Sequence, residues 1–129
     1  MLTRGATATQ LDAETDQIGY RLQHEGHSTQ VWCEDCVSGI PRHLEAGSVD
    51  VVVTSPPYNL GTRYGTYDDT GARAEYVDWM GTWGAAVSEV LADAGSLFLN
   101  IGGKPSDPWG PFEVLLKLRE HFELQTRRH

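Results

Sequence analysis

A serine, two prolines and a tyrosine stand in succession at Ser55, Pro56, Pro57 and Tyr58, directly after a run of β-branched residues. A residue that precedes proline is restricted to extended backbone, and each proline lacks an amide donor. The resulting corner is stiff, and it presents one hydroxyl, at least one free carbonyl oxygen and an aromatic ring. Such a set suits a planar group that carries an NH₂, because the two oxygens accept its hydrogens and the ring stacks on its face.

An exocyclic amine of a nucleobase is a poor nucleophile because its lone pair is delocalised into the ring. Two well-placed acceptors favour the pyramidal nitrogen, and they do so most strongly in the transition state, where such help accelerates a reaction. The amine can then displace a methyl group from a sulfonium donor in line. This chemistry requires neither a metal nor a covalent enzyme intermediate.

Three short apolar runs predict strands at 31–35, 49–54 and 96–101, and the second of these, rich in valine, reads as a buried strand. Helical segments separate them, first a turn or two within 41–46 and then an amphipathic helix over 76–91, where apolar residues recur at three- and four-residue steps. This alternation predicts an α/β fold, with a parallel sheet of about three strands, flanking helices and right-handed crossovers.

A last helix is predicted to begin near Pro111, since proline suits a first helical turn. Its apolar face is expected to comprise four residues: Phe112, Leu115, Leu116 and Phe122. In the preceding long helix, Gly81 and Gly84 are each expected to cost up to ~1 kcal/mol of helix stability.

In parallel sheets of this kind, ligands bind beyond the carboxyl ends of the strands. The predicted ends are Asp35, 54–58 and 100–102. Asp35 could contact a bound ligand or cap the following helix. Asn100 could line the same crevice or be a plain polar residue at a strand end.

The segment 49–59, VDVVVTSPPYN, resembles the catalytic motif of the amino-specific DNA methyltransferases, which is Asp/Asn/Ser-Pro-Pro followed by an aromatic residue. Upstream, 32–36 and 48–50 resemble the approach to that motif, and downstream 76–79 and 90–102 resemble the next helix and strand. The likeness covers roughly residues 30–125.

The resemblance implies a partial Rossmann-like methyltransferase fold that uses S-adenosylmethionine to methylate N4 of cytosine or N6 of adenine in double-stranded DNA. It implies that Ser55 and Pro56 hold the amine, that Pro57 stiffens the turn and that Tyr58 stacks on a flipped-out base. Asp35 would contact the adenine side of the cofactor. Serine at the first motif position is commoner in the cytosine branch, but it also occurs in adenine enzymes.

The motif lies near the N-terminus, as in the permuted branch of the family, but the chain contains no Phe-x-Gly-x-Gly cofactor turn. We therefore expect a polar arm at 1–29, with a short helical or strand-like piece near 18–22. Residues 30–129 would be an incomplete catalytic domain without the cofactor glycine motif and the target-recognition region. A complementing C-terminal polypeptide would then be a partner.

Two alternatives remain open. The chain could be an inactive truncated remnant or a protein-interaction fragment. It could also be an N-methyltransferase that acts on a protein glutamine, because a related Asn-Pro-Pro-Tyr motif serves that reaction. In those enzymes the cofactor strand lies upstream, and its absence here counts against the glutamine hypothesis.

With 129 residues and a net charge of −8, the chain is one domain at most and lacks the basic surplus of a self-sufficient DNA binder. DNA would be held mainly by residues outside this chain. Arg63, Arg73 and Lys104 could touch phosphates, but solvated surface charge is the favoured role for each.

No apolar run is long enough to span a membrane and no secretory signal is present, so a cytoplasmic location is expected. The pair Cys33 and Cys36 could form a redox site, or a zinc site with His24 and His27. Small hydrophobic residues are the favoured reading of both cysteines, and no metal is expected.

Overall fold

A computed structural model describes residues 7–10, 18–61, 63–64, 67–68 and 70–125. The chain divides into two compact units, Met1–Gly39 and Ile40–His129, and each is described by itself. Within the described ranges, no helix combines the length and the apolar character needed to cross a membrane.

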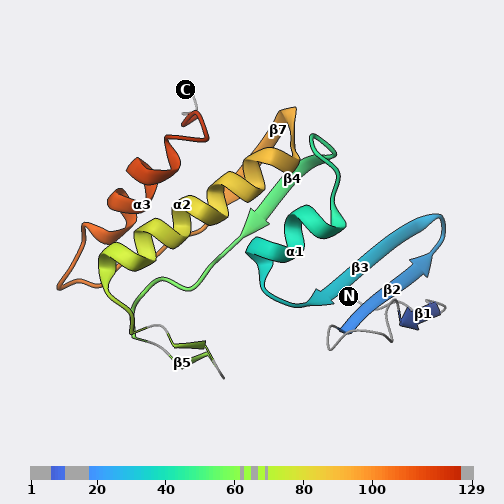
Figure 1. Ribbon diagram of the computed structural model, residues 1–129, viewed down its shortest axis with the longest axis horizontal. Helices are drawn as coiled ribbons and strands as arrows, with labels where there is room; N and C mark the ends of the chain where they lie inside the picture. The colour runs from blue at the N-terminus through green and yellow to red at the C-terminus, as the bar shows by residue number, and fades with distance from the viewer. Residues whose placement is uncertain (1–6, 11–17, 62, 65–66, 69, 126–129) are drawn as a thin grey trace. The chain divides into compact units, whose positions relative to one another are not determined.

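The first unit contains one antiparallel sheet in the order β1-β2-β3 (Figure 1). Its strands are β1 (Thr7–Gln10), β2 (Ile18–His24) and β3 (His27–Cys33). Glu25 and Gly26 connect β2 to β3 with φ values of 46° and 81°. A two-residue turn with both φ values positive matches the twist of a β-hairpin, so the local backbone dictates antiparallel pairing here.

The strand expected at 31–35 as part of the parallel sheet is therefore a wrong prediction. Residues 31–33 belong to β3, which pairs with β2 and not with a parallel neighbour. The strand-like piece expected near 18–22 is present as β2. Across the hairpin, Gly19 faces Trp32, and a Cβ at Gly19 would lie 2.2 Å from ring atom Cζ3, so glycine makes room for the indole.

Helix α1 (Cys36–His43) follows β3 and begins five residues earlier than the segment expected at 41–46. Asp35 accounts for the early start. Its Oδ1 accepts a hydrogen bond from the backbone N–H of Ser38 at 3.0 Å, which satisfies one of the free donors of a first helical turn.

The second unit contains the parallel pair that the sequence predicts. Strand β4 (Val49–Thr54) runs parallel to β7 (Leu91–Leu99), and α2 (Arg73–Val90) crosses between them. The short antiparallel pair β5 (Arg63–Tyr64) and β6 (Tyr67–Asp68) lies between β4 and α2 in the sequence. The α/β class and the parallel pairing are confirmed, while the parallel sheet has two strands in the described residues instead of about three.

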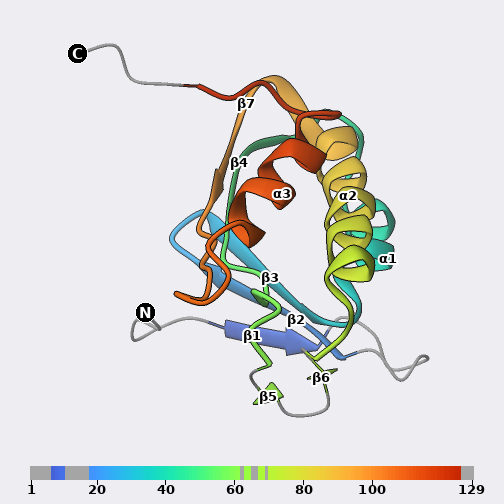
Figure 2. The same cartoon turned by 90° about the vertical axis from the view of Figure 1, so that its left-hand side faces the viewer.

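One face of this two-stranded sheet is covered and the other is open. Figure 2 shows β4 and β7 side by side, with α2 and α3 (Gly110–Leu118) together on one side of them. On the open face, the side chains of Val51, Val53 and Phe98 are 55%, 76% and 61% exposed. The composition of the valine run predicts a strand buried on both faces, but the structure covers only one face of it.

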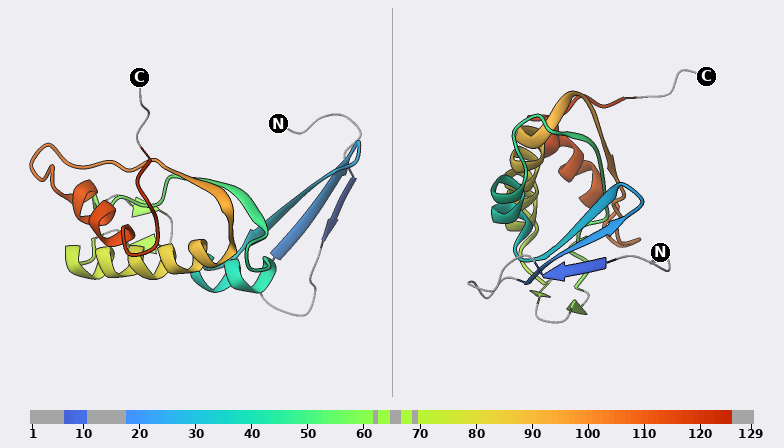
Figure 3. Two further views of the ribbon diagram at one scale, coloured as in Figure 1. Left: turned by 90° about the horizontal axis from the view of Figure 1, so that it is seen from above. Right: turned by 90° about the vertical axis from the view of Figure 1, so that its right-hand side faces the viewer.

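The core of this unit lies mainly along α2 and extends to α3. Its buried hydrophobic residues are Tyr76, Met80, Trp83, Val87, Val90, Val114 and Leu118. Helix α3 lies along part of α2 (Figure 3, left). The contact uses Gly81 and Gly84, which lie one turn apart. A Cβ on them would come within 2.4 Å of Lys117 and 2.5 Å of Leu118, respectively. The two glycines thus let the second helix approach closely, which offsets their cost in helix propensity.

The apolar face predicted for α3 is only partly right. The helix buries Val114 and Leu118, whereas three of the four predicted residues are exposed, Phe112 by 57%, Leu115 by 40% and Leu116 by 65%. Phe122, beyond the end of the helix, is half-buried. An apolar pattern predicts that a helix has a buried face. Here the groove on α2 formed at Gly81 and Gly84, which we call the glycine groove, determines which side chains of α3 are buried.

Candidate functional site

The corner at 55–58 lies where two parallel strands end together. Because β4 ends at Thr54 and β7 ends at Leu99, their carboxyl ends meet at one edge of the sheet. The backbone N–H of Asn100 donates to the carbonyl oxygen of Thr54 at 2.9 Å. Two of the three strand ends predicted to form the site, 54–58 and 100–102, are therefore adjacent.

Three polar side chains form a chain of hydrogen bonds at this edge. The hydroxyls of Ser55 and Tyr58 are hydrogen-bonded to each other, and Asn100 Nδ2 donates to the Tyr58 hydroxyl oxygen at 3.0 Å. Ser55 and Asn100 are exposed and Tyr58 is half-buried. The serine oxygen is thus held in place while remaining open to solvent on one side.

The ring of Tyr58 lies against the backbone at Gly102. A Cβ at that position would be 2.9 Å from Cδ2 of the tyrosine ring, a distance that real side chains do not tolerate. A glycine is therefore needed here for the ring to adopt this position. Gly102, three residues beyond the end of β7, thus helps to set the orientation of the Tyr58 ring.

A third contact ties the corner to α2. Tyr76 is only 6% exposed, and its hydroxyl donates to the carbonyl oxygen of Pro57 at 2.7 Å. Pro56 is buried. Within the described part of the chain, the carbonyls of Ser55 and Pro56 have no hydrogen bond. Together with the Ser55 hydroxyl, they are the acceptors that the corner can offer to an amine.

Asn59 turns the chain away from the corner. Its φ of 56° is left-handed, a conformation that asparagine tolerates better than most residues. Its Nδ2 donates to the carbonyl oxygen of Gly71 at 2.9 Å, which joins the start and the end of the segment between β4 and α2.

Asp35 lies in the other unit, so its position relative to the corner is not described. Its Oδ1 caps α1, as the capping alternative predicts, and Ser38 Oγ donates to its carbonyl oxygen at 3.2 Å. The second carboxylate oxygen has no hydrogen bond in the described residues. The cofactor contact predicted for Asp35 stays a prediction.

The cysteine and histidine residues of the first unit do not converge. His24 pairs with His27 at the turn of the hairpin, and Cys33 lies at the opposite end, paired with Ile18. Six residues of extended strand separate His27 from Cys33 by roughly 20 Å. These side chains cannot share one zinc ion. Across the described residues, no group of three or more His, Cys, Asp or Glu side chains could hold a metal.

The environment of Cys36 does not favour redox chemistry either. Partial burial raises the pKa of its thiol, and the neighbouring carboxylate of Asp35 raises it further. Reactive cysteines of Cys-x-x-Cys motifs have a lowered pKa, because the thiolate is the nucleophile. Both cysteines are free thiols.

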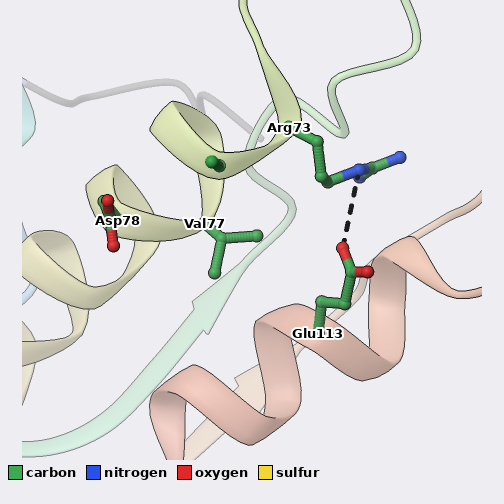
Figure 4. A pocket seen from close by; sticks show the side chains of 5 residues that line it. Arg73, Val77, Asp78 and Glu113 are labelled. Carbon is green, nitrogen blue, oxygen red and sulfur yellow. Dashed lines mark ion pairs between the residues drawn. The ribbon is translucent and has the colours of Figure 1, made fainter.

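Arg73 is engaged in ion pairs at the start of α2. Its guanidinium binds Asp107 and lies 3.8 Å from a carboxylate oxygen of Glu113 on α3, as Figure 4 shows for the second pair. A pocket lined by these helices also includes Val77 and Asp78. Arg73 therefore joins α2 to α3 and is not a free phosphate ligand. The sequence also singled out Arg63 and Lys104. The side chain of Arg63 is not among those that the structure describes, and the backbone of Lys104 pairs with that of Asp107 in an isolated β-bridge.

Sequence reasoning missed two residues of the site. Tyr76 fits the apolar spacing of the helix predicted over 76–91, which gives it no role beyond packing. A buried tyrosine usually needs a partner for its hydroxyl, and that need was the available signal. Gly102 carried a weaker signal, namely a glycine directly after a strand end, where close approach of another group is common.

Comparisons with known proteins match the part of the chain that contains this corner. The family model for DNA methylases of the N6/N4 type matches residues 49–127, more than half of the chain. The match begins with β4 and includes the corner, α2, β7 and α3.

Three type II methyltransferases are similar to the chain. M.MjaVI of Methanocaldococcus jannaschii is 46% identical over 54 residues, which are 42% of this chain and 28% of the relative. M.HpaI of Haemophilus parainfluenzae is 33% identical over 72 residues, 56% of this chain and 23% of the relative. M.ScaI of Streptomyces caespitosus is 38% identical over 56 residues, 43% of this chain and 17% of the relative. The matched part thus spans less than a third of each relative.

Proposed function

Because the chain belongs to the N6/N4 DNA methylase family, we propose that its corner at 55–58 binds an exocyclic amine of DNA for methylation. The acceptor is N4 of cytosine or N6 of adenine, and the methyl donor is S-adenosylmethionine. The observation that carries this proposal is the meeting of the corner with the end of β7. There the Ser55 hydroxyl is exposed, and the carbonyls of Ser55 and Pro56 accept no hydrogen bond from the part of the chain that the structure describes.

In the proposed reaction, Ser55 Oγ and the Pro56 carbonyl accept the two amine hydrogens, which favours a pyramidal nitrogen with a free lone pair. When bound, S-adenosylmethionine supplies the methyl group as an electrophile on a sulfonium. The new N–C bond forms as the S–C bond breaks, and the methylated nitrogen then loses one proton to water. Tyr58 stacks on the base, as the family resemblance implies.

For the cofactor, we propose that Asp35 contacts the adenine amino group through its second carboxylate oxygen, because the first already caps α1. A carboxylate suits this role, since it accepts hydrogen bonds from an amino group. The glycine turn of the family is absent from this chain. We assign the remaining cofactor contacts to a complementing polypeptide.

Two features support the involvement of such a polypeptide. The net charge of −8 does not suit DNA binding by this chain alone. The open face of the sheet, with Val51, Val53 and Phe98, offers an apolar surface for another layer. We propose a cytoplasmic location as well, since both cysteines are free thiols and disulfides are rare in that compartment.

A graft tests the proposed function. Residues 49–127 replace the matching segment of M.HpaI, and transfer of a labelled methyl group to DNA is measured, with mass spectrometry of the nucleosides to identify the base. We expect methylation by the graft and a loss of about 100-fold or more for Ser55→Ala, because one acceptor in the transition state is removed. Cofactor binding should persist.

The matched control is Ser88→Ala, which removes a hydroxyl that bonds only to its own helix, at Ala85. This control should transfer methyl groups at the rate of the unmodified graft. A graft that binds cofactor but methylates no base, or a Ser55→Ala graft with full activity, would contradict the proposal.

A further inference from the structure

We propose that Tyr76 is a positioning residue for the amine-binding corner. Its hydroxyl holds the carbonyl of Pro57 and so determines which carbonyl oxygens of the corner stay available to the substrate. One part of this inference, that the substrate is an amine, rests on the proposed function. The mechanical part, that one hydroxyl on α2 fixes the corner, is independent of that function.

The corner needs a side-chain donor because its own backbone is poor in donors. Pro56 and Pro57 have no N–H groups, so neither can be joined to a neighbouring strand through an amide. The carbonyl oxygens are the remaining backbone attachment points. Of these, Thr54 is bound by the amide of Asn100 at 2.9 Å, and Pro57 is bound by Tyr76 at 2.7 Å.

Tyr76 is itself held rigidly. It lies in the first turns of α2, where its backbone N–H donates to Ala72 at 3.1 Å, and its ring stacks on Trp79 with a centroid distance of 6.4 Å. One turn further along, Met80 is fully buried. A hydroxyl mounted on such a support fixes the carbonyl that it binds, whereas a solvent molecule in its place would hold that carbonyl less rigidly.

The consequence for chemistry is a selection among acceptors. With the Pro57 carbonyl occupied, an incoming amine meets the Ser55 hydroxyl and the carbonyls of Ser55 and Pro56. The hydrogen bond from Tyr76 uses one of the two lone pairs of the Pro57 carbonyl and directs this carbonyl toward α2, which makes it a poorer acceptor for the amine. Tyr76 therefore favours one orientation of the amine over others without touching it.

The first measurement is made on the complete 129-residue chain and needs no methyl transfer. Backbone ¹⁵N order parameters are compared between the unmodified chain, Tyr76→Phe and the control Ser88→Ala. We expect values near 0.85 at Tyr58 and Asn59 in the unmodified chain and in the control, and a fall below about 0.6 in Tyr76→Phe. Val87, further along α2, should keep its value in all three proteins.

Two results of this measurement would overturn the proposal. Equal order parameters at Tyr58 and Asn59 in Tyr76→Phe would show that the hydroxyl does not hold the corner. An equal fall at Val87 would show general loosening of α2 instead of a local role. Tyr76→Phe keeps the buried ring, which limits damage to the fold, and a second variant, Tyr76→Leu, should lower the same two order parameters.

The second measurement uses the graft described above. Tyr76→Phe should lower kcat for methyl transfer by about tenfold, the effect of one hydrogen bond, while KM for the cofactor stays unchanged. An unchanged kcat would overturn the assignment of Tyr76 even if the corner loosens. If no form of the graft methylates DNA, the proposed function fails, and the order parameters still decide whether Tyr76 holds the corner.

Discussion

At the scale of single residues, the hydrogen-bond directions determine what Ser55 can do. Asn100 has only hydrogens on its Nδ2, so it donates to the Tyr58 oxygen. The phenolic proton of Tyr58 can then point to Ser55 Oγ, with which it shares a hydrogen bond. With the phenolic proton in this position, Ser55 has one lone pair left for an amine, and its own proton points away from Tyr58.

Replacing the hydrogen-bond donor at position 100 with an acceptor tests the direction of the hydrogen bond between Tyr58 and Ser55. Asn100→Asp keeps the shape of the side chain but replaces the donor with an acceptor, which draws the phenolic proton away from Ser55. We expect methyl transfer by the graft to fall about tenfold in Asn100→Ala, which only removes the contact, and further in Asn100→Asp. Transfer by Asn100→Asp at the unmodified rate would show that this donor does not matter.

The sequence predicted some of these residues and not others, for reasons of distance along the chain. The position of Ser55 and Tyr58 at a strand end follows from four consecutive residues after a β-branched run, a local signal. The contact between Tyr76 and Pro57 joins residues 19 apart, and that between Asn100 and Tyr58 joins residues 42 apart. Only the folded chain brings such pairs together.

At the scale of elements, the same distinction holds. Short apolar runs predicted β4 and β7, helical periodicity predicted α2, and their alternation predicted the parallel arrangement, because it leaves few topologies. Strand β7 begins at Leu91, five residues before the predicted start. The pairing of β3 was missed, since the two-residue turn at Glu25 and Gly26 lies in a polar region with little periodicity. The buried face of α3 was also missed in part, because the partner helix selects it.

The glycine groove between α2 and α3 yields a paired prediction on stability. At Gly84 an added methyl would meet Leu118, which is 4% exposed, so Gly84→Ala forces a buried side chain to move. At Gly81 the methyl would meet the flexible stem of Lys117, which can swing aside. Overpacking costs about 1–3 kcal/mol, whereas replacing a helical glycine with alanine gains up to ~1 kcal/mol.

We therefore expect Gly84→Ala to unfold at lower urea concentration than the unmodified chain, and Gly81→Ala to unfold at equal or higher concentration. Loss of helical circular dichroism in urea measures both. The two variants differ only in which α3 side chain the new methyl meets, so each serves as the control for the other. Equal stability of the two would mean that α3 does not pack against α2 as described.

At the scale of the whole molecule, the exposed apolar surface and the acidic charge point the same way. Besides the open face of the sheet, the rings of Trp109 and Phe112 at the start of α3 lie against each other, tilted by 59° with a centroid distance of 5.9 Å, and both are more than half exposed. Such apolar surfaces usually mark sites of interaction in other proteins. Together with the excess of acidic residues, they are the observations behind our proposal that the chain depends on a further polypeptide.

The final prediction follows from this dependence. The 129-residue chain alone should bind S-adenosylmethionine only weakly, because it lacks the family's glycine turn, and it should self-associate through its open apolar faces while keeping its fold. Titration calorimetry of the chain with S-adenosylmethionine measures the first property, and light scattering measures the second. S-adenosylhomocysteine serves as the control ligand, since it shares the adenosine part but has no methyl group. Binding with a micromolar Kd by a monomeric chain would refute the prediction, and it would place the cofactor site within these residues instead of in a complementing polypeptide.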